Sequence, residues 1–82
     1  MSSQQVPPSL RDIIADVLET SPEQVTPDLS SSTVDAWDSF RHLQLILAIE
    51  GEYSVQFDPQ RIPELTSVAL LQAELQTKGA AL

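Results

Sequence analysis

The segment from Ser39 to Tyr53 constrains the fold most, because it carries two apolar stripes at helical spacing. The first stripe contains Leu45, Ile46, Ile49 and Tyr53, and the second contains Phe40, Leu43 and Leu47. Recurrence every three or four residues is typical of one face of an α-helix. One stripe is enough to face a small core. The second is therefore either buried because the helix is central, or available for contact with another protein.

Two further segments also predict helices. A first helix can begin at Pro7-Pro8, because proline tolerates the first helical turn. Its apolar residues recur at helical spacing and are Leu10, Ile13, Ile14, Val17 and Leu18. We expect this helix to end at Thr20-Ser21-Pro22. A last helix is expected to begin at Thr66 or Ser67 and to stop near Gly79. The expected inner face of that last helix contains Val68, Leu71 and Leu75.

The connections between these helices are unequal. Residues 21–38 exceed the usual helix–helix connection of about 2–8 residues, so we expect this stretch to be pinned to the bundle or functional. Its spaced apolar residues, the candidate anchors, are Val25, Leu29, Val34 and Trp37. Residues 54–57 are predicted to form an extended linker. A short helix is then expected from Asp58-Pro59 to Pro63.

Together these elements predict a single all-α domain over residues 1–82, with residues 1–6 and 79–82 as frayed ends. The predicted architecture is a small four-helix bundle. It has three longer helices, one short helix and a long loop between the first and second helices.

The charge balance restricts the possible partners. Twelve acidic residues face four basic ones, which gives a formal charge of −8. Nucleic acid and anionic membranes are disfavoured as partners, whereas a basic protein surface is favoured. The same charge favours a monomer. The start of the chain does not resemble a secretory signal and no apolar run is long enough to span a bilayer, so we expect a cytoplasmic protein.

The composition also restricts the chemistry. The chain has no cysteine, so any thiol chemistry requires an attached group. Asp28, Asp35 and Asp38 do not have calcium-loop spacing, and we expect no metal site.

Ser39 is the candidate functional residue. It follows Asp38 at the expected start of the second helix, where unpaired N–H groups and the helix dipole favour a negative group. The position therefore suits a covalently attached phosphate. Ser39 could instead serve only as the helix cap. Asp38 is the better cap, however, and would leave the Ser39 hydroxyl free.

The residues around Ser39 do not predict an enzyme. His42 lies three positions later, but a catalytic pair would also need an orienting acid, an oxyanion hole and a pocket, and no Gly-x-Ser-x-Gly turn is present. We therefore expect His42 to be solvated or to face a partner. Trp37 is expected to anchor the loop rather than to contact a partner. Glu50 and Glu52 are expected to form a solvated helix end.

The order of these features resembles the acyl carrier protein family over about residues 8–77. Asp38-Ser39-Phe40 is similar to the family's Asp-Ser-Leu attachment motif, and the segment Leu45–Tyr53 is similar to its apolar helix that ends in acids and an aromatic residue. The resemblance implies that a phosphopantetheinyl transferase attaches 4′-phosphopantetheine to Ser39, with Asp38 helping the transferase to position its metal and coenzyme. The arm would carry an acyl thioester to loading, condensing or transferring enzymes with basic docking surfaces.

Several positions depart from the family pattern. Asp35-Ala36-Trp37 stands where Leu-Gly is common, and Phe40 replaces leucine. Arg41 and Gln44 stand where carriers of fatty-acid synthesis usually have acids, which points to a specialised pathway. The expected partner-binding residues are Phe40, Arg41, Leu43, Gln44 and Leu47.

Three alternatives remain. The first is an aminoacyl or peptidyl carrier with the same arm and attachment site. The second is an acidic helical interaction module that receives no arm and uses the second apolar stripe to bind a partner. A hydrolase is a distant third.

Overall fold

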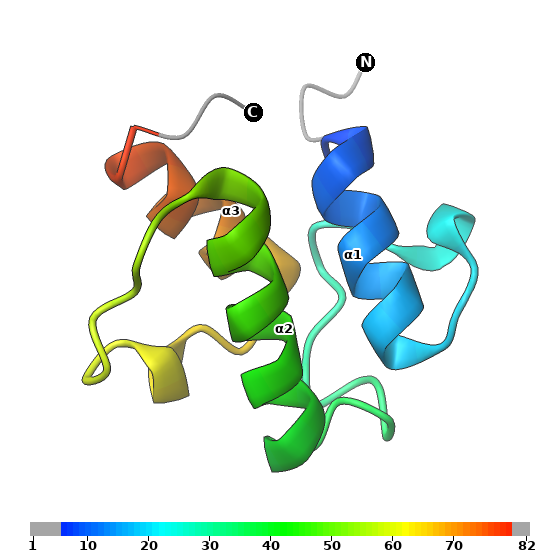
Figure 1. Cartoon of the computed structure of the whole chain (residues 1–82). Helices are drawn as coiled ribbons and strands as arrows, with labels where there is room; N and C mark the ends of the chain where they lie inside the picture. The colour runs from blue at the N-terminus through cyan, green and yellow to red at the C-terminus, as the bar shows by residue number, and fades with distance from the viewer. Residues whose placement is uncertain (1–5, 80–82) are drawn as a thin grey trace.

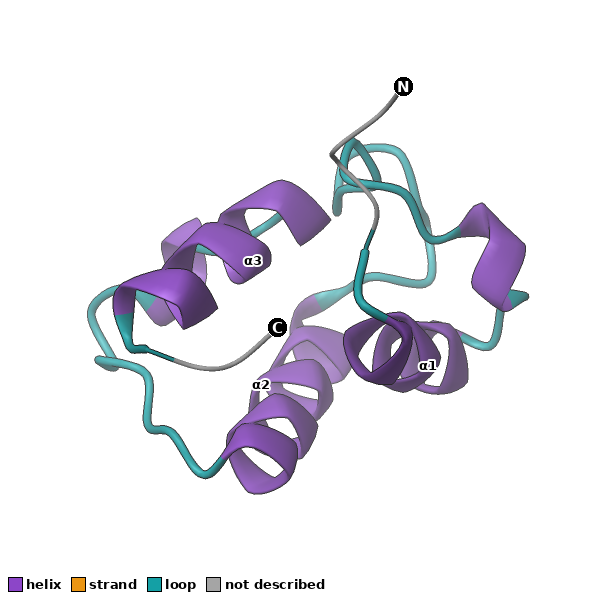
Figure 2. Cartoon of the chain, turned by 90° about the horizontal axis from the view of Figure 1, so that it is seen from above, coloured by secondary structure: helices purple, strands orange, loops and turns teal. Residues whose placement is uncertain are grey.

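The computed structural model describes residues 6–79, which form three α-helices joined by connections that contain two single 3₁₀ turns (Figure 1). The helices are α1 (Pro8–Leu18), α2 (Ser39–Tyr53) and α3 (Val68–Thr77), and the 3₁₀ turns are η1 (Pro22–Gln24) and η2 (Ile62–Glu64). α1 and α2 pack side by side, and α3 lies behind α2 in the view of Figure 1, set apart from the α1–α2 pair in the view from above (Figure 2). Within the described residues there is no strand, only an isolated bridge between Ser30 and Ser67. The predicted all-α class and helix order are confirmed.

The core is built from the inner faces of the three α-helices. The largest fully buried side chains are aliphatic: Leu10, Ile14, Leu45, Ile46, Ile49, Leu65, Val68, Leu71 and Leu75. Val6 is also buried, so the expected frayed start does not extend to this residue. The other residues predicted to fray at the two ends, 1–5 and 80–82, lie outside the described residues. Gly79 is described and has φ +81°, the left-handed conformation that favours glycine after a helix.

The long connection between α1 and α2 is pinned, as predicted. α1 ends where Glu19 adopts a left-handed backbone with φ 57°. The connection then runs against the start of α3, where Leu29 O accepts from Val68 N at 2.9 Å and Pro27 O accepts from Ala69 N at 3.0 Å. The first N–H groups of a helix lack carbonyl partners of their own, so these two bonds satisfy groups at the start of α3.

Two of the candidate anchors in this connection, Val25 and Trp37, are buried. The other two, Leu29 and Val34, are partly buried and pack against the core.

The short fourth helix differs from the prediction. The prediction of a helix from Asp58-Pro59 to Pro63 is wrong, because residues 59–61 form a turn and η2 begins only at Ile62. The Asp58 side chain accepts a hydrogen bond from Gln60 N at 3.0 Å, which closes this turn. Pro63 has no N–H and disfavours the α conformation at Ile62, so a longer α-helix cannot form here.

None of the helices between residues 6 and 79 has both the length and the apolar character that a membrane span requires.

Candidate functional site

Ser39 is the first residue of α2, and Asp38 precedes it as the helix cap. Asp38 Oδ1 accepts a hydrogen bond from Arg41 N at 2.9 Å, and the Asp38 carbonyl accepts from His42 N at 2.8 Å. Asp38 is thus the cap, as predicted, and Ser39 is not needed in that role. The Ser39 side chain is exposed, and no hydrogen bond joins its hydroxyl to any residue between 6 and 79.

The surroundings of Ser39 suit a negative group. The first N–H groups of an α-helix such as α2 have no carbonyl partner within the helix, because no helical turn precedes them. The helix dipole also places partial positive charge at this end. A phosphate on the Ser39 oxygen would lie in water beside these groups and would carry little desolvation cost.

An open groove with a volume of about 610 Å³ borders Ser39. Three separate segments form it: the connection before α2, the first turn of α2, and residues 62–66. Its lining residues are Ser31, Trp37, Asp38, Ser39, His42, Leu43, Ile62, Pro63 and Thr66. The lining combines apolar side chains with hydroxyl groups, the carboxylate of Asp38 and the imidazole of His42. The groove was not predicted from the sequence, because its walls come from segments far apart in the chain.

His42 is partly buried and bonded within the protein, so the expectation of a solvated side chain is wrong, whereas a partner-facing role stays a prediction. The Trp37 indole N–H donates to His42 Nδ1 at 3.0 Å, and His42 Nε2 lies 2.7 Å from the carbonyl oxygen of Ile62. Both ring nitrogens are therefore used within the protein, and neither is left to act as a base on Ser39. Trp37 is only 3 % exposed, which confirms its predicted role as an anchor.

Arg41 also makes intramolecular contacts. Its guanidinium group donates to the carbonyl oxygen of Val17 at 2.8 Å and lies 3.5 Å from the Glu19 carboxylate. Only 28 % of the Arg41 side chain is exposed. Its predicted contact with a partner stays a prediction, but two of the guanidinium's contacts in this structure are to the end of α1.

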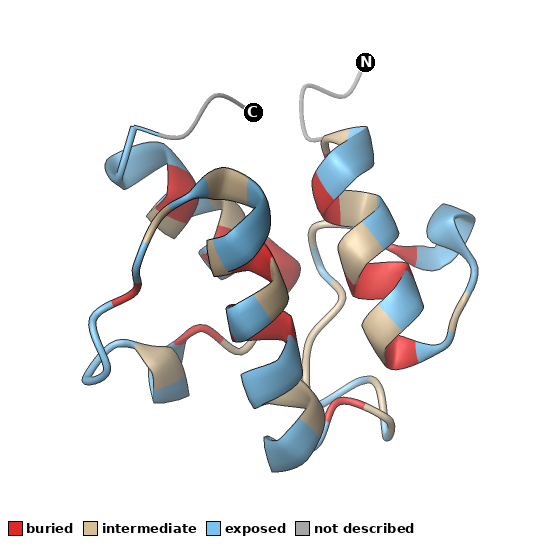
Figure 3. Ribbon diagram, in the orientation of Figure 1, coloured by how far each residue is buried: buried red, intermediate tan, exposed pale blue. Residues whose placement is uncertain are grey.

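The second apolar stripe of α2 faces solvent. Phe40 is 70 % exposed, Leu43 54 % and Leu47 67 %, and exposed surface runs along the outer side of α2 in Figure 3. Gln44 is exposed on the same helix. Of the two explanations for this stripe, burial in a central helix is therefore wrong. The remaining explanation, a contact face, stays a prediction because the structure contains no partner.

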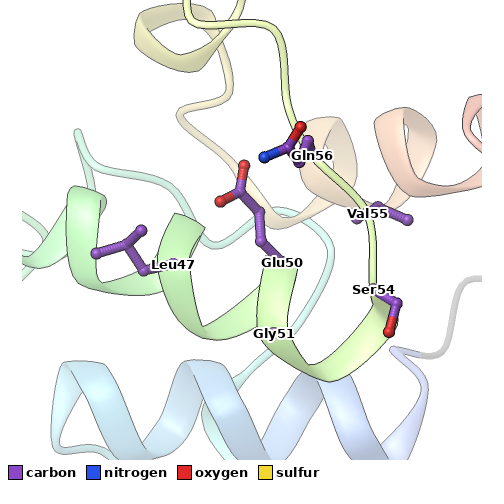
Figure 4. Close-up of a pocket in the computed structure, with 6 residues that line it drawn as sticks. All are labelled: Leu47, Glu50, Gly51, Ser54, Val55 and Gln56. Atoms are coloured by element: carbon purple, nitrogen blue, oxygen red, sulfur yellow. The ribbon is translucent and has the colours of Figure 1, made fainter.

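A second depression, of about 640 Å³, lies at the other end of α2 (Figure 4). Its lining residues are Leu47, Glu50, Gly51, Ser54, Val55 and Gln56. Glu50 is half-buried and its carboxylate accepts a hydrogen bond from Phe57 N at 2.8 Å, so it ties the linker to α2. The expectation of a solvated helix end is wrong for Glu50, whereas Glu52 is exposed. Within residues 6–79, no group of three or more acidic or histidine side chains is placed to hold a metal ion.

Comparison with curated proteins finds a similarity over the full length of the chain. The chain is 28 % identical to an acyl carrier protein from Thermosynechococcus vestitus over 81 residues, which cover 99 % of this chain and 100 % of that protein. No protein-family model matches the chain. The similarity over the whole length, together with the helical fold, supports an acyl-carrier-like identity and a carrier role.

Proposed function

We propose that this protein is an acyl carrier that receives 4′-phosphopantetheine on Ser39 and delivers acyl groups to partner enzymes. The observation that supports this most directly is the geometry of Asp38 and Ser39. Asp38 supplies the cap of α2, so the Ser39 hydroxyl stands exposed and unengaged at the positive end of a helix. A residue in this position can accept a phosphodiester without breaking any contact of the fold.

In the proposed modification, Ser39 Oγ forms the new bond to phosphorus and loses its proton. The pyrophosphate bond of coenzyme A breaks, and adenosine 3′,5′-bisphosphate leaves. The attached arm supplies a thiol for thioester formation, which this chain lacks because it has no cysteine. The helical domain then binds each partner enzyme, and the tether keeps the cargo at a high effective concentration in that partner's active site.

The exposed stripe beside Ser39 is the proposed docking face for these partners. Phe40 lies next to the attachment residue, and Leu43 and Leu47 follow on the next turns of α2. Gln44 replaces an acid on this helix, and Arg41 faces α1, so the face itself is apolar and uncharged. Such a face favours partners that bury apolar surface, with the acidic remainder of the protein contacting basic residues around them. This pattern supports a specialised pathway rather than primary fatty-acid synthesis.

Intact-mass analysis tests the proposal. The protein is incubated with coenzyme A, magnesium and a broad-specificity phosphopantetheinyl transferase, and we expect one phosphopantetheine mass to be added. Ser39→Ala should abolish the addition. Ser21→Ala is the matched control, because Ser21 is also exposed, precedes a helical turn and makes no capping hydrogen bond. Modification that persists in Ser39→Ala, or its absence in the wild type, would contradict the proposal.

The exposed stripe also supports a second candidate, an interaction module that never receives an arm. This candidate predicts no mass addition and partner binding that Ser39→Ala leaves unchanged. An aminoacyl carrier would share the fold, the arm and the site. The mass of the cargo on protein purified from its native host distinguishes that variant from an acyl carrier.

A further inference from the structure

His42 joins two separate segments beside Ser39. Its Nδ1 atom lies 3.0 Å from the indole nitrogen of Trp37, in the connection before α2, and its Nε2 atom lies 2.7 Å from the carbonyl oxygen of Ile62 in η2. The two rings also stack, with centroids 6.1 Å apart and an interplanar angle of 26°. All three residues line the groove at Ser39. The contacts of His42 therefore set the distance between two walls of the groove, the one that contains Trp37 and the one that contains Ile62.

The partners of His42 determine its protonation state. An indole N–H can only donate, so Nδ1 must accept and carries no proton. A carbonyl oxygen can only accept, so Nε2 must carry the proton and donate it to Ile62. The two contacts together require the neutral imidazole with hydrogen on Nε2. A second proton, on Nδ1, would place two donors against each other and break the hydrogen bond to Trp37, whereas the bond to Ile62 could persist.

The bridge matters because it is the direct polar link from α2 to η2, whereas Ile62 otherwise packs against the core and Arg61, next to η2, pairs with Glu74 of α3. η2 is a single turn that packs sparsely against the three α-helices. Among residues 6–79, the contact from His42 to Ile62 is the only hydrogen bond between α2 and η2. On its other side, Trp37 immediately precedes Asp38 and Ser39. Loss of the Trp37 hydrogen bond would thus uncouple the segment that leads to the attachment residue from the opposite wall of the groove.

We propose that His42 is a positioning residue: when neutral it couples the Trp37-Asp38-Ser39 segment to η2, and when protonated it releases that segment. Imidazole is the side chain that commonly gains a proton between about pH 5 and 8. The inference deepens the proposed function, on which it rests for its biological meaning, because release would change how Ser39 and any group on it meet the groove.

Few other charged side chains lie near His42, and most of them are paired away from the groove. Asp38 is the only other titratable side chain in the groove lining. Arg61, which precedes η2, pairs with Glu64 at the end of η2 at 3.0 Å and with Glu74 of α3 at 3.1 Å, and none of the three lines the groove. Arg41, next to His42 in sequence, contacts Val17 and Glu19. Asp38→Asn therefore removes the one competing titration while keeping a side-chain oxygen for the cap.

The test uses the unmodified protein and its single histidine and single tryptophan. In ¹⁵N-labelled Asp38→Asn protein, the imidazole, the indole N–H and the backbone amides of Trp37 and of residue 38 are followed by NMR between about pH 8 and 5. We expect the indole resonance to lose its hydrogen-bonded shift in step with the imidazole titration, and the two amides to shift with the same midpoint. An indole resonance that stays constant while the imidazole titrates would overturn the proposal.

A second variant separates mechanical coupling from the field of the new charge. Trp37→Phe keeps an aromatic ring against His42 but removes the indole N–H. In this background we expect the imidazole still to titrate and the residue 38 amide to lose its pH-dependent shift. An unchanged shift in Trp37→Phe would mean that charge alone moves the amide, and the proposal would fail. Neither NMR experiment needs the phosphopantetheine arm, so a failure to modify Ser39 would not affect the inference about His42. Likewise, an indole resonance that does not follow the imidazole would not affect the proposal that the protein is a carrier.

Discussion

Arg41, in the first turn of α2, donates a hydrogen bond to the carbonyl oxygen of Val17, in the last turn of α1, across 2.8 Å. The last carbonyl groups of a helix have no N–H partner one turn later, and a cation at that end also interacts favourably with the helix dipole. One side chain thus stabilises the end of one helix and joins it to the start of the next. The turn that carries Ser39 is positioned partly by this contact.

Arg41→Ala should lower the free energy of unfolding by about 1–2 kcal/mol, because it removes a charge-assisted hydrogen bond to a carbonyl group. The ion pair with Glu19 is more exposed and longer, so Glu19→Gln should cost only about 0.5 kcal/mol or less. Urea unfolding followed by the fluorescence of Trp37 measures both values. Equal losses in the two variants would show that the ion pair, and not the bond to Val17, is the stabilising contact.

Asp38→Ala should lower the free energy of unfolding by about 1 kcal/mol, since it removes the cap of α2. Asp38→Asn should retain most of that stability, because asparagine caps as well as aspartate. Under the proposed function, both variants should be modified more slowly by the transferase, because both lack the carboxylate. Asp35→Ala is the control, as Asp35 is exposed and lies in the same connection. An Asp38→Asn protein as unstable as Asp38→Ala would argue against capping as the origin of the loss.

Ile46 and Leu47 are neighbours on α2 with opposite surroundings. Ile46 is 2 % exposed, so Ile46→Ala should lower the free energy of unfolding by about 2–5 kcal/mol, and Ile46→Val by about 0.5–1.5 kcal/mol. Leu47→Ala should change it by no more than about 0.5 kcal/mol. Thermal unfolding followed by circular dichroism gives the comparison. A large loss for Leu47→Ala would show that the outer stripe contributes to the stability of the fold.

Phe40→Ala should raise the KM of the transferase for this protein by about fivefold or more, because exposed aromatic residues at a contact face often contribute about 1 kcal/mol or more to binding. The stability of the variant should stay unchanged, since Phe40 is not part of the core. Leu70→Ala is the matched control: Leu70 is 44 % exposed but belongs to α3. A similar rise in KM for Leu70→Ala would contradict a docking face confined to α2.

The helices were predictable because their signals are local. The periodicity of Leu10, Ile14 and Leu18 places one face of α1 in the core whatever the other segments do, and a cap such as Asp38 acts within three residues of its own position. The candidate attachment residue was accessible to the same reasoning, because Ser39 stands at a helix start that the sequence marks. The extent of the short fourth helix was not predicted correctly, since Pro63 outweighs the cap signal of Asp58-Pro59.

The roles of His42 and Arg41 depended on the tertiary structure. His42 meets a carbonyl group 20 positions later in the chain, and Arg41 meets one 24 positions earlier. Backbone carbonyl groups leave no trace in the sequence, because every residue has one, so no pattern of side chains could identify these partners. The exposure of Phe40, Leu43 and Leu47 was decided in the same way. Helical spacing puts them on one face, but only the packing of α1, α2 and α3 determines that this face remains in solvent.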